Sequence, residues 1–364
     1  MKISVITPRF TIAGVPLAQI RFAKALQKYG HDVTMIVGYI DPSFKIPPIE
    51  NISLFNMNKK SVKRMLIPIC KYLLTEKPDI IFSAEDHLNI IILVAAQLTN
   101  SSVKISGSSR VTPFDTYSNK IFSKQWILKL IASKVMSRAD ALTCVSKEMV
   151  SQYNEVFKNP PHQCIYNIVV DSESQKRMLE PVNHPWIDYK KTPLLIAAGK
   201  LAPWKGFEDL IYAISELDSV LDLRLLILGD GPLRDQLNTL ILKLNLQNKI
   251  SLVGYVSNPL KYFYQADVFV LSSHVEGMPN VLIEAMMCGC TPVSTDCPTG
   301  PAEVLREEKY GYLAETKNPI SLAKKIQEAL NTPIPIPKLN EGIKDFHESA
   351  IINKHFESLG IPYN

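Results

Sequence analysis

The chain has 364 residues, of which 46% are hydrophobic and 21% are charged, and this composition is typical of a globular protein with two domains of ordinary size. No apolar run approaches the roughly 18–20 residues that a membrane-spanning helix needs. The first seven residues are too short and too strand-like for a secretory signal, so we expect a cytoplasmic protein. Cys288, Cys290 and Cys297 fit small buried thiols better than a metal site.

The net charge of +5 is unevenly distributed. Residues 1–170 contain 21 Lys and Arg against 11 Asp and Glu, whereas residues 171–364 contain 19 against 24. A basic first half favours an anionic partner, either a phospholipid surface or a phosphate-bearing acceptor. A solvated basic surface without a partner is the alternative. We expect no nucleic-acid partner.

Apolar β-branched runs alternate with helical patterns in residues 1–170, which predicts parallel βαβ units in an N-terminal domain. The expected strands are Ile3–Thr7, Val33–Val37, Asp79–Phe82, Val103–Ser106 and Ala141–Val145. The expected helices include Leu17–Tyr29, Leu88–Leu98 and Ile121–Ser137. Residues 171–193 are polar, contain three prolines and show no apolar period, so we interpret them as a linker.

The alternation restarts in residues 194–340, which predicts a second doubly wound domain. Its expected strands are Leu194–Ala198, Arg224–Leu228, Ile250–Val253, Asp267–Leu271, Thr291–Thr295 and Gly311–Ala314. After a helix at Pro319–Leu330, the strip Pro333–Pro337 is expected to be extended, and a last helix is expected over about 340–358 within the C-terminal segment 341–364. Ligands of such sheets bind beyond the strand C-termini, here in a cleft between the two domains.

The segment Glu276–Met286 is the most informative motif. It follows an expected strand, and Pro279 can begin a helix whose N-terminal amides form a seat for phosphate. Carboxylates at Glu276 and Glu284 can accept hydrogen bonds from ribose or sugar hydroxyls. The segment therefore predicts a nucleotide-sugar site, with phosphate near Gly277, Met278, Pro279 and Asn280. Two exposed surface glutamates are the alternative.

The loop Gly199–Gly206 carries two cations, Lys200 and Lys205, directly after the first strand of the second domain. Two cations on such a loop can neutralise the diphosphate that departs when a glycosyl bond breaks, although both could be solvated loop lysines. Gly254 and Val256 follow another expected strand, where their backbone groups would lie near the base of a nucleotide. Gly14, near the first helix of the chain, permits close approach of a phosphate, but no Gly-x-Gly-x-x-Gly fingerprint or Walker motif is present.

Together these segments resemble the retaining glycosyltransferase family 4, whose GT-B fold has two Rossmann-like domains that face each other across a cleft. The resemblance covers nearly the whole chain, and it implies that the C-terminal helix, in residues 341–364, crosses back to the first domain. Its most specific part is the E-x7-E motif from Glu276 to Glu284, and the segments Ser294–Leu305 and Arg110–Ser118 are similar to a subgroup that builds bacterial surface glycans and lipid-linked oligosaccharides.

The resemblance implies a role for each matched residue. Glu284 would bind the nucleotide ribose, Glu276 would contact the donor sugar, and Gly14 and Lys205 would lie at the donor phosphates. Lys200 stands where the family usually has Arg. The family's N-terminal histidine is missing from Gly107–Arg110, which leaves Arg110 and His87 as acceptor-side candidates, with a surface or helix-capping role as the alternative for His87.

The implied reaction moves a hexose or N-acetylhexosamine from a nucleoside-diphosphate sugar, with UDP favoured, to a glycan acceptor that a polyprenyl diphosphate carries. Lys200, Lys205 and the helix amides would stabilise the leaving diphosphate, so no cofactor and no essential metal are expected. A UDP-sugar 2-epimerase on the same fold and a non-catalytic glycan- or lipid-binding partner are the alternatives. A basic amphipathic segment at 59–74, which Pro68 is expected to interrupt, favours peripheral contact with the inner face of the cell membrane, unless its apolar residues pack on the sheet.

Overall fold

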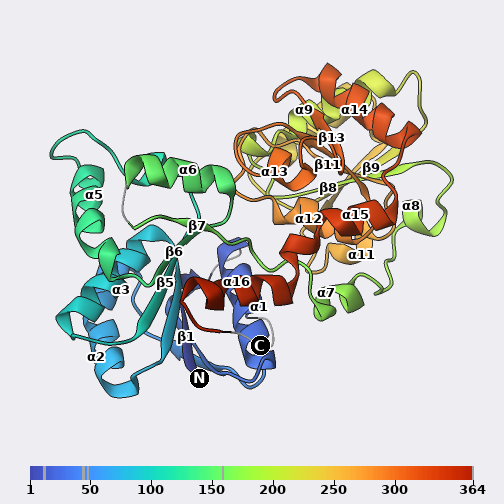
Figure 1. Cartoon of the computed structure of the whole chain (residues 1–364). Coiled ribbons are helices and arrows are strands. Elements are labelled where there is room, and N and C mark those ends of the chain that lie inside the picture. The colour runs from blue at the N-terminus through green and yellow to red at the C-terminus, as the bar shows by residue number, and fades with distance from the viewer. Residues whose placement is uncertain (11–13, 43–45, 47–48, 158–159, 363–364) are drawn as a thin grey trace. The chain divides into compact units, whose positions relative to one another are not determined.

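The computed structural model describes residues 1–10, 14–42, 46, 49–157 and 160–362. The chain forms two compact units. The first comprises Met1–Ile168 and Glu348–Asn364, and the second comprises Val169–His347. Each unit is a parallel β-sheet that helices cover (Figure 1). The predicted fold class, α/β with two Rossmann-like doubly wound domains, is therefore confirmed.

The first sheet has the strand order β3-β2-β1-β4-β5-β6-β7. Its central strand β1 is fully buried at Val5, which pairs with Met35 on one side and Phe82 on the other. The chain adds β2 and β3 on one side of β1 and then β4 to β7 on the other side. The topological switch point of the sheet therefore lies between β1 and β4. The strands are β1 (Lys2–Phe10), β2 (Asp32–Ile40), β3 (Ser53–Asn56), β4 (Ile80–Ala84), β5 (Lys104–Ser109), β6 (Ala141–Cys144) and β7 (Gln163–Cys164).

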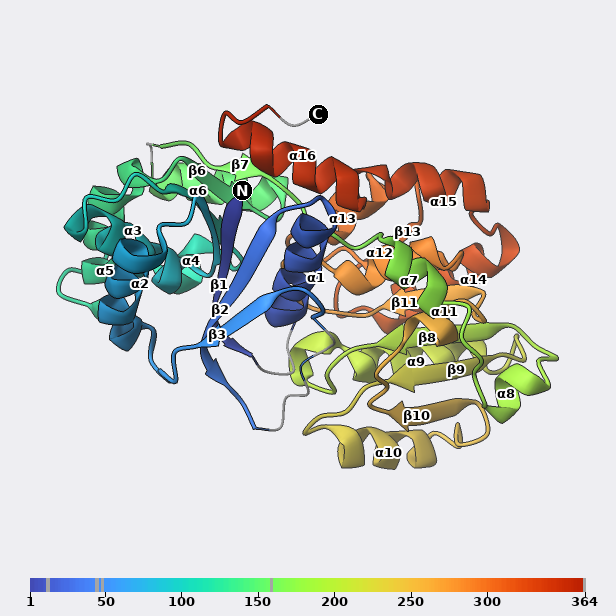
Figure 2. The ribbon, with the colours of Figure 1, turned by 90° about the horizontal axis from the view of Figure 1, so that it is seen from below.

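Helices cover both faces of the first sheet. α2 and α3 lie on one face, while α1 and the C-terminal helix α16 lie on the other (Figures 1 and 2). α16 buries Ile352 and Phe356 completely against this unit. The helices are α1 (Gly14–Lys28), α2 (Leu66–Glu76), α3 (Asp86–Leu98), α4 (Pro113–Thr116), α5 (Lys124–Val135), α6 (Lys147–Val156) and α16 (Glu348–Ser358), with short 3-10 turns η1 (Val62–Met65) and η2 (Met136–Arg138).

The second sheet repeats this topology with the order β10-β9-β8-β11-β12-β13. Its switch point lies between β8 and β11, where Val268 pairs with Leu195 and Phe269 pairs with Ile196. All four of these side chains are almost completely buried. The strands are β8 (Leu194–Ala198), β9 (Arg224–Leu228), β10 (Ile250–Gly254), β11 (Val268–Leu271), β12 (Thr291–Thr295) and β13 (Tyr312–Ala314).

The long helices of the second unit bury apolar side chains. In α9, for example, Leu210, Ile211 and Ile214 are fully buried in the core below the sheet, at the spacing of one helical face. The helices are α7 (Ser172–Arg177), α8 (Pro185–Asp188), α9 (Phe207–Leu217), α10 (Arg234–Lys243), α11 (Leu260–Phe263), α12 (Asn280–Met287), α13 (Pro301–Leu305), α14 (Pro319–Asn331) and α15 (Ile336–Gly342), with 3-10 turns η3 (Pro203–Lys205) and η4 (Lys344–Phe346).

Three local expectations were wrong. The strip of residues 333–337 is not extended throughout: Pro335 has an extended backbone, but α15 begins at Ile336 and places Pro337 in its first turn, where the missing amide hydrogen costs nothing. The single helix expected at about 340–358 is divided into α15, η4 and α16. Pro68 does not interrupt its segment either, since α2 begins at Leu66 and Pro68 lies in the first turn.

Candidate donor site

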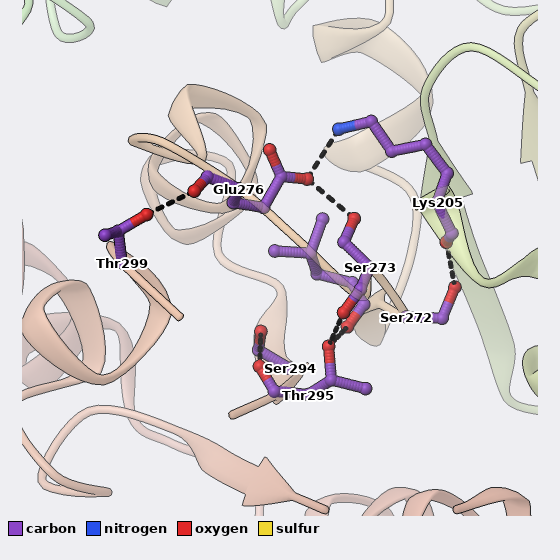
Figure 3. Close-up of polar contacts among 8 residues, drawn as sticks. Lys205, Ser272, Ser273, Glu276, Ser294, Thr295 and Thr299 are labelled. Atoms are coloured by element: carbon purple, nitrogen blue, oxygen red, sulfur yellow. Dashed lines mark hydrogen bonds and ion pairs between the residues drawn. The ribbon is translucent and has the colours of Figure 1, made fainter. Parts of the chain in front are cut away.

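The candidate site of the second unit lies at the carboxyl ends of β8 and β11, which flank the switch point of the sheet. Lys205 ends the short η3 turn after β8, and Glu276 lies in the loop after β11. Their side chains meet, with Lys205 Nζ 2.5 Å from Glu276 Oε1 (Figure 3). The structure thus brings together two residues that are 71 positions apart in the sequence. Doubly wound sheets bind their ligands at this point.

Glu276 is held from three directions. Its Oε1 accepts the Lys205 ammonium and, at 2.6 Å, the Ser273 hydroxyl. The Thr299 hydroxyl donates to its backbone carbonyl. Only 11% of the Glu276 side chain and 19% of the Lys205 side chain are exposed. Both side-chain bonds end on Oε1, so Oε2 keeps its capacity to accept hydrogen bonds from a ligand hydroxyl.

The loop that carries Glu276 is fastened to the β8 side of the site. The Ser272 hydroxyl donates to the Lys205 carbonyl at 2.9 Å (Figure 3), and the His274 amide donates to the Trp204 carbonyl at 2.8 Å. His274 Nε2 also lies 2.6 Å from the Asp209 carboxylate in the first turn of α9. These bonds fix the distance between the cation and the carboxylate, which pre-organises the site before a ligand arrives.

Two glycines permit this close approach of the loops. Gly206 has φ +62°, and a Cβ there would lie 2.0 Å from the Ser272 carbonyl oxygen. Gly300 has φ +95°, and its Cβ would lie 2.5 Å from Pro279 Cδ and 2.8 Å from the Gly277 carbonyl oxygen. Both positions therefore exclude any side chain, on steric grounds and because of the left-handed backbone.

α12 follows the Glu276 loop and carries Glu284, a half-buried residue of its second turn. The start of α12 differs in one detail from the prediction that its N-terminal amides are free to bind phosphate. The Asn280 amide donates to the Met278 carbonyl at 2.9 Å, because Pro279 closes a tight turn at the N-cap. The Asn280 amide is therefore already used within the loop and is not free for an anion at this helix end.

The remaining predicted donor residues differ in burial and in their contacts. The Lys205 carbon chain passes over Gly199, where a Cβ would lie 3.7 Å from Lys205 Cδ. Lys200 lies on the same loop but is exposed. Gly254 ends β10, and its carbonyl accepts the Gly229 amide at 2.8 Å. Val256 follows as a half-buried residue.

The candidates in the first unit lie on different elements of the chain. Gly14 begins α1, directly after residues 11–13, which lie outside the described part of the chain. Arg110 follows β5, and burial lowers the pKa of its guanidinium to about 10. His87 is exposed in the first turn of α3. Of these three, Arg110 lines a cavity of the first unit and His87 does not.

The sequence analysis missed several polar contacts of the donor site. Ser273, Thr299 and the Asp209–His274 pair were not singled out, because Ser, Thr and Asp are common in loops and their partners come from other loops. One signal was available: the dipeptide Ser272-Ser273 stands at the carboxyl end of a predicted strand, where ligand-binding side chains gather in parallel sheets.

Cys288, Cys290 and Cys297 are buried, and burial raises the pKa of each thiol. In the described residues, no group of three or more His, Cys, Asp or Glu is arranged to hold a metal ion. No helix within the described ranges has both the length and the apolarity needed to cross a membrane.

Comparison with known proteins places the chain in a family. The model of the family "Glycosyl transferases group 1" matches residues 185–346. An uncharacterized glycosyltransferase of Methanocaldococcus jannaschii is 31% identical over 277 residues, which cover 71% of this chain and 67% of the relative. A Campylobacter jejuni protein is 30% identical over 259 residues, with the same coverage. Its name is N-acetylgalactosamine-N,N'-diacetylbacillosaminyl-diphospho-undecaprenol 4-alpha-N-acetylgalactosaminyltransferase.

Solved structures agree in fold over the whole chain. A glycosyltransferase of Rickettsia africae matches with a TM-score of 0.78 and 18% identity, covering 98% of this chain and 97% of the other. Anabaena HepE in complex with UDP matches with a TM-score of 0.75 and 17% identity, covering 99% and 100%. Both likenesses support the GT-B architecture. From its two relatives of at least 30% identity and its family match, the chain belongs to the group 1 glycosyltransferases and is an enzyme that transfers glycosyl groups.

Proposed function

We propose that this enzyme transfers a hexose or N-acetylhexosamine from a UDP-sugar, with retention of configuration, to a glycan acceptor linked to polyprenyl diphosphate. The observation that carries the proposal is the Lys205–Glu276 pair at the switch point of the second sheet, with Glu284 on the following helix. In this proposal, Lys205 is the cation for a leaving phosphate, and Glu276 and Glu284 are the two carboxylates for hydroxyl groups.

In the proposed reaction, Lys205 leaves or shares its bond with Glu276 and approaches the donor diphosphate. Its ammonium carries three donors, of which the Glu276 contact uses one. The exposed Lys200 on the same loop would add a second positive charge. As the bond between the sugar C1 and the phosphate oxygen breaks, these charges stabilise the diphosphate that leaves. They take the part that a divalent cation would otherwise play, so we expect no essential metal.

The two carboxylates would hold the hydroxyl groups of the donor. Glu276 Oε2, which accepts neither the Lys205 nor the Ser273 bond, would accept from a sugar hydroxyl, and Glu284 would accept from the ribose diol. The acceptor hydroxyl then forms the new bond to C1 on the face that the diphosphate leaves, and its proton passes to the leaving phosphate oxygen. No protein nucleophile takes part.

The nature of the two substrates is supported by the relatives. The C. jejuni relative is named for an acceptor linked to diphospho-undecaprenol, and so is a second one of 25% identity. The structural neighbour HepE binds UDP. The basic excess in residues 1–170 suits a phosphate-bearing acceptor. Exposed Ile67, Lys71 and Leu74 lie along one side of α2 and support peripheral contact with an anionic membrane at its inner, cytoplasmic face.

A screen of nucleotide sugars by thermal shift, followed by Glu284→Gln on the best ligand, tests the donor assignment. The UDP-sugar should raise the melting temperature of the wild-type chain. We expect Glu284→Gln to weaken its binding about tenfold or more, because a charged hydrogen-bond acceptor contributes about 1.5–3 kcal/mol. Glu216→Gln, the same change on an exposed residue of α9, should leave binding unchanged.

Two results would contradict the proposal. One is donor binding that Glu284→Gln does not affect. The other is epimerised UDP-sugar formed from the donor alone, which would show an isomerase rather than a transferase reaction. Release of UDP that requires an added lipid-linked glycan is the expected result.

A further inference from the structure

The first unit exposes a group of large apolar side chains in α5 and in the turn before it. Within residues 121–131, five such side chains are 41–85% exposed: Ile121, Phe122, Ile127, Leu130 and Ile131. Single exposed apolar residues are common on protein surfaces, whereas a group of them marks an interaction site. We call these five residues, together with Lys124 and Lys134, the α5 surface.

α5 presents this surface on a face that it does not use for packing. The helix packs against α3 (Figure 1) and buries Ala132 and Val135. The exposed face follows the spacing i, i+3, i+4 and i+7, which aligns side chains along one side of a helix. Its members are Ile127, Leu130, Ile131 and Lys134. The apolar residues therefore form a continuous stripe.

Phe122 extends the stripe beyond the start of the helix. Its side chain is 85% exposed, and its backbone has φ +63°, a left-handed conformation that is unfavourable for an aromatic residue. The ring contacts that of Trp126 edge to face, with the centroids 5.8 Å apart. The fold thus holds an aromatic ring in solvent at a cost in backbone strain, and such strain is characteristic of binding sites.

The charges along this stretch are positive. Residues 120–138 contain four lysines and one arginine but no Asp or Glu. Arg138 forms an ion pair with Asp140, whereas Lys124 and Lys134 are exposed. A second copy of the chain does not suit the surface, because a symmetric contact would bring lysines against lysines. Exposed apolar residues interspersed with lysines are instead typical of a helix that lies in the headgroup region of an anionic bilayer.

We propose that the α5 surface binds an anionic phospholipid membrane. Phe122 and the apolar stripe of α5 enter the boundary between headgroups and acyl chains, and the lysines contact lipid phosphates. The proposal deepens the proposed function, on which it rests, because it assigns the main membrane contact to α5. α2 packs against the same helix α3, and its exposed Ile67 and Leu74 extend the contact.

Co-sedimentation of the full chain with vesicles tests the proposal. We expect binding to vesicles of phosphatidylglycerol and phosphatidylcholine in equal parts, and little binding to phosphatidylcholine alone. Phe122→Ser/Ile127→Ser/Leu130→Ser should weaken binding at least about tenfold, because the apolar area that enters the bilayer is lost. Lys124→Gln/Lys134→Gln should weaken it about fivefold for each lysine at low salt.

The matched control removes three apolar side chains of similar or greater exposure from the second unit: Val220→Ser/Leu242→Ser/Ile320→Ser. It should bind vesicles as the wild type does. Both triple variants should melt near the wild-type temperature, because all six side chains are exposed. Ile67→Ser/Leu74→Ser on α2 should weaken binding less than the α5 triple variant does.

Trp126 reports whether α5 itself contacts lipid. Trp186→Phe/Trp204→Phe leaves it as the single tryptophan of the chain. Replacing the phosphatidylcholine of the mixed vesicles by a form with brominated acyl chains should then quench its fluorescence. Binding without quenching would place the contact on another surface and overturn the proposal.

Three further results would overturn it: equal binding to both kinds of vesicle, equal binding by the α5 triple variant and its control, or a dimer in sedimentation velocity that the α5 triple variant dissociates. Vesicle binding is measured without donor or acceptor. A failure here therefore leaves the transferase proposal standing, and a failure of the Glu284→Gln test leaves the membrane contact standing.

Discussion

At Lys205 and Glu276, two opposite charges each reduce the cost of burying the other. Lys205→Met should lower the transfer rate about 10²–10³-fold, because the leaving diphosphate loses a well-placed positive group. It should also lower the free energy of unfolding of the second unit by about 1–3 kcal/mol, because Glu276 then remains poorly solvated without its counter-ion. Lys243→Met, on the exposed side of α10, is the control for both readouts.

The double variant Lys205→Met/Glu276→Gln isolates the coupling between the two residues. It should recover part of the lost stability, since neither charge remains, while transfer stays low. The free energies of unfolding are measured by urea unfolding. If the losses in the two single variants simply add in the double variant, the 2.5 Å contact between Lys205 and Glu276 contributes little to stability in solution.

Residue by residue, the sequence predicted the charged groups of the donor site better than their surroundings. Lys205 and Glu276 could be chosen because their loops follow predicted strands of a doubly wound sheet and match the motifs of the family that the chain resembles. Their actual contact, and the part of Ser273 and Thr299 in it, depends on how two loops 71 residues apart meet. That Arg110 Nε is buried without a hydrogen-bond partner in the described residues could not be predicted either, because it depends on how the fold surrounds that side chain.

Among the elements, the buried strands were predictable and the edges were not. β8, β9 and β12 have the predicted bounds, because short runs of almost entirely buried residues between turns are typical of parallel strands that are covered on both faces. β3 and β7 were missed: Ser53–Asn56 is mostly exposed, and Gln163–Cys164 has two residues. Such segments become strands through pairing with a neighbour rather than through their own pattern.

The loop between η3 and α9 provides a test at the scale of elements. Gly206→Ala places a methyl group 2.0 Å from the Ser272 carbonyl oxygen in a left-handed backbone. The backbone cost is about 1–2 kcal/mol, and the clash must also displace the loop that carries Lys205. Gly289→Ala has a similar φ of +89° but only ordinary contacts at 3.7 Å and beyond. We therefore expect Gly206→Ala to lower the urea midpoint more than Gly289→Ala and to lower the transfer rate, which the control should not affect. Equal effects on stability would contradict the clash.

At the scale of the whole molecule, the connectivity of the two units predicts that the first unit needs the C-terminal segment of the chain for its stability and that the second unit does not. The second unit is one continuous segment, Val169–His347, whereas the first needs Glu348–Asn364 from the other end of the chain. α16 and the turn after it contribute four buried apolar side chains to the first unit: Ile351, Ile352, Phe356 and Leu359. At about 1.5–3 kcal/mol for each large side chain, their burial matches the entire stability of a typical domain.

A fragment of residues 169–347 should therefore unfold cooperatively and bind UDP, while a fragment of residues 1–168 should lack a cooperative transition by circular dichroism. Fusing residues 348–364 to the end of the 1–168 fragment through a flexible Gly/Ser linker should restore the transition, because the linker adds only a small loop-closure cost. The same fusion with Ile352→Asp and Phe356→Asp is the control and should remain unfolded. A cooperative transition in the unfused 1–168 fragment would mean that the sheet and α1–α6 bury enough apolar surface by themselves, and that α16 serves the first unit without being needed for its folding.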